Sequence, residues 1–152
     1  MGAIFSDIYL IDFCAVLLVN IFNLMCAWMF ALRAQSKPAA GRVFGWIGVA
    51  AGLGLVVPAA CSAVLGRPWW TVGLPAVLVL YCLVELVADG LLKLPFRQSR
   101  WLGPYLGLYY LGSMIMVGYA FLVNPAWGVV TLVTYFVNLA AALISFKRVG
   151  HG

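Results

Sequence analysis

Charged side chains are scarce in this chain. Of its 152 residues only 9% are Asp, Glu, Lys or Arg, whereas a soluble domain carries about 25%. Hydrophobic residues make up 66% of the sequence, and the mean hydropathy is +1.09. So few charges could not cover this much apolar surface in water. The composition therefore excludes a soluble globule, a disordered chain and a disulfide-stapled secreted module, and it indicates an integral membrane protein.

Side chains that commonly bind metals or carry catalysis are also few. The one histidine is His151, close to the C-terminus, and the four cysteines form no C-x-x-C pair. Zinc sites, haem ligation and dithiol redox sites need such residues at close spacing. The sequence also lacks a phosphate-binding glycine loop and a Ser/His/Asp set. We therefore expect no metal and no cofactor, and we do not expect common hydrolase, oxidoreductase or kinase chemistries.

Long apolar runs fill most of the chain. A helix needs about 20 apolar residues to cross the hydrocarbon core of a membrane. Five runs reach this length, and short segments with proline, glycine or polar residues separate them. The sequence predicts an all-α, polytopic bundle of five transmembrane helices that forms a single domain over residues 1–152. The expected spans are about residues 8–32, 43–65, 70–92, 102–122 and 127–146. Pro58 predicts a kink inside the second span.

The basic residues are distributed unevenly between the two sides of this bundle. Eight of the nine Lys and Arg residues lie at one side, and Arg67 is alone at the other. Because positive charge favours the cytoplasmic side, we expect the N-terminus outside and the C-terminus in the cytoplasm of a plasma or inner membrane. The basic residues would then lie beside anionic lipid headgroups, so no nucleic-acid partner is expected. The eight are Arg33, Lys37, Arg42, Lys93, Arg97, Arg100, Lys147 and Arg148.

Three acidic residues lie inside the predicted spans. Glu85 falls about 22 Å below the outer interface, where a carboxylate must be paired, hydrated or protonated. We expect Glu85 to face the bundle interior. Asp89 and Lys93 follow it on one α-helical stripe and are expected to form an ion pair near the cytoplasmic end. Asp12 enters the first span about one turn below the outer interface.

Polar side chains of the other spans fall at a depth similar to that of Glu85. Counting along antiparallel helices predicts one polar layer around this carboxylate. Two interpretations remain open: hydrogen bonds that hold the helices together, or a pocket in which Glu85 is the acidic group. The candidate ligand-binding residues are Glu85, Asp12, Asn20, Asn23, Tyr109, Tyr110 and Asn138.

A short resemblance bears on the third and fourth spans. The sequence ELV at residues 85–87, followed by WLGP at residues 101–104, is similar to part of the emopamil-binding family of membrane sterol isomerases. That resemblance implies acid-catalysed isomerisation of a sterol-like lipid. The histidine and the second glutamate that such chemistry would use are absent, so no family is assigned from the sequence.

Three functions are compatible with these observations. The preferred hypothesis is a protein that binds or transports a small lipophilic or cationic molecule at Glu85, with or without a coupled proton. The second is an intramembrane isomerase or cyclase of an isoprenoid or sterol-like lipid, with Glu85 or Asp89 as general acid. The third is a non-catalytic accessory or assembly subunit. Since five helices barely enclose a pathway, we expect a homo-oligomer or a larger membrane complex.

Overall fold

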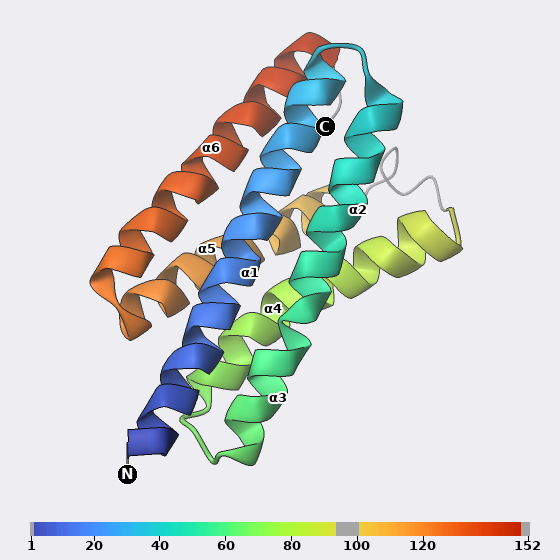
Figure 1. Cartoon of the computed structure of the whole chain (residues 1–152). Helices are drawn as coiled ribbons and strands as arrows, with labels where there is room; N and C mark the ends of the chain where they lie inside the picture. The colour runs from blue at the N-terminus through green and yellow to red at the C-terminus, as the bar shows by residue number, and fades with distance from the viewer. Residues whose placement is uncertain (1, 94–100, 150–152) are drawn as a thin grey trace.

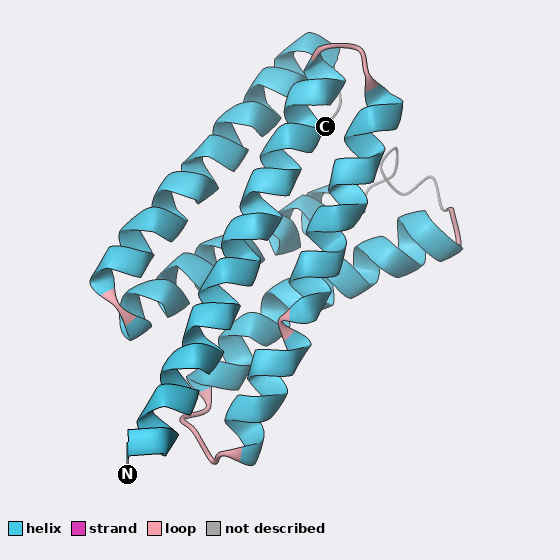
Figure 2. Ribbon diagram, in the orientation of Figure 1, coloured by secondary structure: helices cyan, strands magenta, loops and turns pink. Residues whose placement is uncertain are grey.

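All the regular structure in the described part of the chain is helical. The computed structural model describes residues 2–93 and 101–149, with side chains from residue 8 onward within these ranges. Arg97, Arg100 and His151 lie outside the described residues. Figures 1 and 2 show the helices packed side by side in one bundle. In chain order they are α1 (Gly2–Ala34), α2 (Pro38–Gly54), α3 (Val56–Val64), α4 (Trp70–Glu85), the π-helix η1 (Leu86–Leu91), α5 (Leu102–Val123) and α6 (Pro125–Val149).

Five helical stretches are long and apolar enough to cross a membrane, which confirms the prediction of a multi-pass membrane protein. Two of them are composite, because α2 and α3 form the second span and α4 and η1 form the third. The second span begins earlier than expected because Pro38, which needs no hydrogen-bond partner for a backbone N–H, occupies its first turn. The spans are Ile8–Ala34, Pro38–Val64, Trp70–Leu91, Leu102–Val123 and Pro125–Val149.

The second span is interrupted one turn before Pro58. Proline has no N–H to donate to the carbonyl of Gly54, and its ring crowds that carbonyl. The helix stops at Gly54 and restarts at Val56, with the N–H of Leu55 donating to the carbonyl of Gly52 over 3.2 Å. The kink expected in this span is therefore centred at Leu55.

The third span ends in a π-helix that the sequence did not predict. In η1 the hydrogen bonds reach one residue further along the chain, as from the N–H of Leu92 to the carbonyl of Val87 at 2.9 Å. This wider turn changes the angular spacing after Glu85. Lys93 lies beyond the helix with a left-handed φ of 50°. The predicted α-helical stripe through Glu85, Asp89 and Lys93 is therefore wrong.

The five spans form a closed ring in chain order. Each span packs against the next, and α6 returns to pack along α1, which consequently lies between α2 and α6 (Figure 1). Glycines permit the closest approaches. A Cβ atom added at Gly52 would lie 2.3 Å from Sγ of Cys82, and one at Gly112 would lie 3.2 Å from Cα of Leu78. These glycines let α2 and α5 each approach α4 closely.

The two ends of the bundle are distinguished by their arginines. The N-terminus and the loop 65–69 lie together at the bottom of Figure 1, and we call this the Arg67 end. The loop 35–37 and the last turns of α6 lie together at the top, and we call this the Arg33 end. Arg33 is in the last turn of α1.

Candidate functional site

An aromatic pocket of about 380 Å³ lies toward the Arg33 end of the bundle. All five spans contribute to its walls. Its charged groups among the described residues are Glu85, the last residue of α4, and Arg33 of α1. A pocket of this size and lining is typical of small-molecule sites. The aromatic lining residues are Phe22, Phe30, Tyr81, Tyr105, Tyr109, Tyr110 and Phe146.

Glu85 is buried and accepts a hydrogen bond within this pocket. Only 9% of its surface is exposed, and the hydroxyl of Tyr105 donates to Oε2. The hydroxyl of Tyr81 lies 2.8 Å from that of Tyr105. Because the proton of Tyr105 goes to Glu85, Tyr81 is the donor in this second bond. The prediction that Glu85 faces the bundle interior is correct.

A row of aromatic rings connects Glu85 to Arg33. The ring of Tyr81 lies 5.3 Å from that of Tyr105 and 5.0 Å from that of Tyr109, centre to centre. Tyr109 in turn lies 6.5 Å from Phe30, and Cζ of Arg33 is 5.9 Å from the centre of the Phe30 ring. Three spans thus build one aromatic wall with a carboxylate at one end and a guanidinium at the other.

Tyr109 and Tyr110 line the pocket with Glu85, as the sequence predicts. The hydroxyl of Tyr109 points to α6, where it lies 2.8 Å from Oδ1 and 2.6 Å from Nδ2 of Asn138. Asn138 is therefore a buried residue behind the pocket wall, and it orients Tyr109 without lining the pocket.

Asn20 and Asn23 lie elsewhere, at the packing interface between α1 and α6. Nδ2 of Asn20 donates to Thr131 over 3.0 Å, and Thr134 donates to Oδ1 of Asn20 over 2.6 Å. Nδ2 of Asn23 lies 3.3 Å from Oγ1 of Thr134. Such bonds stabilise a membrane bundle by about 1 kcal/mol or less each. The polar side chains that the sequence assigns to one layer around Glu85 therefore do not all meet there, because Asn20 and Asn23 of α1 face α6 and not α4.

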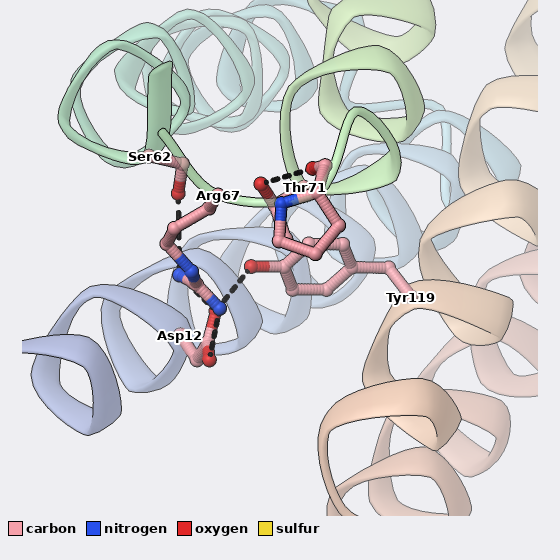
Figure 3. A network of polar contacts seen from close by, with 6 residues as sticks. Asp12, Ser62, Arg67, Thr71 and Tyr119 are labelled. Carbon is pink, nitrogen blue, oxygen red and sulfur yellow. Dashed lines mark hydrogen bonds and ion pairs between the residues drawn. The ribbon is translucent and has the colours of Figure 1, made fainter. Parts of the chain in front are cut away.

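Asp12 lies at the Arg67 end, in a buried ion pair. Figure 3 shows the guanidinium of Arg67 over this carboxylate, with Nη1 2.9 Å from Oδ1 and Nη2 2.8 Å from Oδ2. The hydroxyl of Tyr119 donates to Oδ1 over 2.7 Å, and Nη1 of Arg67 also donates to Ser62 over 3.2 Å. Hydrogen bonding to Asp12 raises the pKa of Arg67, so the guanidinium stays charged. This cluster does not line the pocket.

Asp89 does not join Glu85 in the pocket. It lies half-buried in η1, and it is not among the described residues that line the cavity. The two carboxylates therefore do not converge on one enclosed volume, which acid catalysis by the pair would require.

Three of the charged or hydroxyl-bearing residues that line the pocket are not among the candidates from the sequence: Tyr81, Tyr105 and Arg33. Two signals could have revealed the tyrosines. Tyr81 precedes Glu85 by four residues, and Tyr105 precedes Tyr109 by four, so each pair shares a helix face. The sequence places Arg33 among the basic residues beside the lipid headgroups, because a sequence does not show which way a long side chain turns.

Within residues 2–93 and 101–149 the structure holds no group of three His, Cys, Asp or Glu side chains able to bind a metal ion. No protein-family model, no curated protein and no solved structure matches this chain. The fold and the site define it as a multi-pass helical membrane protein with a carboxylate-containing aromatic pocket.

Proposed function

We propose that this protein binds a small lipophilic cation in the pocket around Glu85, either to hold it or to carry it across the membrane. The observation that carries the proposal is a cavity of about 380 Å³ that combines a buried carboxylate with tyrosine and phenylalanine rings. Aromatic faces attract cations, and the attraction increases when water is excluded. Glu85 supplies the compensating charge at a depth where an uncompensated cation is costly.

The other two hypotheses are less well supported. An acid-catalysed isomerase or cyclase calls for a second acidic group in the pocket, and Asp89 lies outside its described lining. The hypothesis of an accessory subunit gives no role to the buried carboxylate or to the cavity around it. Binding of a cation accounts for both features.

Substitution of Glu85 by glutamine should weaken cation binding. We expect the affinity for tetraphenylphosphonium to fall about tenfold, equivalent to about 1.4 kcal/mol, because the amide keeps the shape but removes the charge. The measurement is equilibrium binding of the radiolabelled cation to the purified full-length chain in detergent micelles. Tetraphenylborate, an anion of nearly the same shape, should bind more weakly than the cation.

Asp89→Asn is the matched control for this experiment. It makes the same chemical change on the same span, outside the described lining of the pocket, and it should leave the affinity unchanged. Equal loss in both variants, or unchanged binding in Glu85→Gln, would show that Glu85 does not hold the cation.

We also propose that the N-terminus lies outside and the C-terminus lies in the cytoplasm of the cell membrane, which puts the pocket near the cytoplasmic face. The asymmetry of eight basic residues against Arg67 supports this orientation. A fluorescent-protein fusion at the C-terminus should fluoresce, and an alkaline phosphatase fusion at the same position should be inactive. An active phosphatase fusion would show that the C-terminus lies outside, which is the opposite of the proposed orientation.

A further inference from the structure

We propose that the natural ligand is a zwitterionic amphiphile, whose ammonium group lies at Glu85 and whose phosphate or carboxylate lies at Arg33. This inference rests on the proposed function and adds the chemical class of the ligand. It comes from three features of the pocket: its two opposite charges, the rings between them and the apolar lining residues that reach the surface of the bundle.

The two charges of the pocket belong to different spans and different ends of its wall. Glu85 lies six residues before the end of the third span at Leu91, and Arg33 lies in the last turn of α1. Arg33 lines the same cavity, with its guanidinium over the ring of Phe30. A guanidinium binds a phosphate or carboxylate through two parallel hydrogen bonds. A ligand with both charges is therefore complementary to both charged groups of the lining.

The wall between the two charges is suited to an ammonium group. Tyr81, Tyr105 and Tyr109 pack with ring centres 5.0–5.3 Å apart across α4 and α5. Rings in this arrangement offer faces to a cation on its way to the carboxylate. The hydroxyl of Tyr81 is hydrogen-bonded to that of Tyr105, and the hydroxyl of Tyr105 donates to Glu85. The positive group of the ligand is therefore best placed at the Glu85 end of this wall.

Apolar residues of α5 and α6 in the pocket lining reach the surface of the bundle. Two of its lining residues on α6, Leu143 and Phe146, are 53% and 59% exposed. Leu102 and Leu106 of α5 line the same pocket and are half-buried. In a membrane this face of the bundle meets acyl chains and not water. An alkyl tail of the ligand would lie against these apolar side chains, with the zwitterionic head inside the pocket.

Lysophospholipids with one tail and different heads test this inference. The full-length chain in dodecyl maltoside is titrated with lysophosphatidylethanolamine and with lysophosphatidylglycerol, which keeps the phosphate but lacks the ammonium, and bound lipid is counted by native mass spectrometry. We expect the ethanolamine lipid to bind about tenfold more tightly. Glu85→Gln should bring the two affinities to within about twofold, because only the ammonium depends on the carboxylate.

Arg33→Gln provides a readout that a merely structural effect would not produce. It should weaken the ethanolamine lipid about tenfold and at the same time strengthen tetraphenylphosphonium, since removing a positive charge helps a pure cation. Arg42→Gln, at an exposed position of α2, should change neither. Water-soluble phosphoethanolamine separates the two sources of the ligand. If it binds far more weakly than the lysolipid, the ligand is a lipid, as proposed; if it binds as tightly, the ligand is a water-soluble zwitterion and the proposal of an amphiphile is wrong.

Equal affinity of the unchanged protein for both lysolipids would overturn the inference. If tetraphenylphosphonium still binds in a Glu85-dependent way, the proposed cation site stands and only the ligand class fails. If neither the cation nor the lipids bind, the proposed function itself fails.

Discussion

Replacing Asp12 with leucine should lower the free energy of unfolding by about 3–5 kcal/mol, because the change leaves the charged Arg67 without its counter-charge. Both side chains are largely buried, with 10% of Arg67 and 7% of Asp12 exposed. Tyr119 would also lose the hydrogen-bond acceptor of its hydroxyl. Arg67→Met should have a similar cost, since it leaves the carboxylate unpaired. Reversible unfolding in mixed detergent and dodecyl sulfate micelles measures both.

The double variant Asp12→Leu with Arg67→Met distinguishes loss of a pair from loss of packing. With both charges removed, the free energy of unfolding should return to within about 1 kcal/mol of the unchanged protein. Arg42→Met makes the same replacement at an exposed position and should cost little. A double variant that loses the sum of the two single effects would show that the pair is not what stabilises this end of the bundle.

Substitution of Ala142 by phenylalanine should abolish binding in the pocket, with a loss of about 100-fold in affinity for tetraphenylphosphonium. Ala142 is buried on α6 and lines the cavity, so the added ring occupies space that the ligand needs. Because the cavity of about 380 Å³ can accommodate the ring, the variant should fold with a stability close to that of the unchanged protein. Binding and unfolding measurements on the same preparation check both expectations.

Ala140→Phe is the control for this substitution. It adds the same ring two residues earlier on α6, at an exposed position that does not line the pocket. Its affinity for the cation should equal that of the unchanged protein. Unchanged binding in Ala142→Phe would place the cation elsewhere, and equal losses in both variants would indicate a general effect on the helix.

Much of the architecture follows directly from the sequence, because membrane spans depend on local properties. Each span needs enough consecutive apolar residues, and the breaks at Pro38 and Gly66 are local too. The inward orientation of Glu85 follows from the cost of exposing a carboxylate to lipid. These conclusions needed no knowledge of which helix neighbours which.

The composition of the site could not be predicted in the same way. Depth and helical angle indicated that Glu85, Asn23 and Asn138 occur in similar layers, but not that they face different neighbours. The order of the ring and the rotation of each helix decided that Asn23 faces α6 and that Tyr105 reaches Glu85. The π-helix after Glu85 further changed the direction of Asp89.

The sequence by itself determined the number of spans, their lengths and the burial of one carboxylate, because hydrophobic transfer acts on each segment separately. Only the tertiary structure decided which polar groups meet. It paired Asp12 with Arg67 across 55 residues, and it brought Arg33 to the pocket of Glu85. Such pairings depend on helix packing over the whole ring, and a hydrogen bond or an ion pair forms only when that packing brings its two partners within about 3 Å.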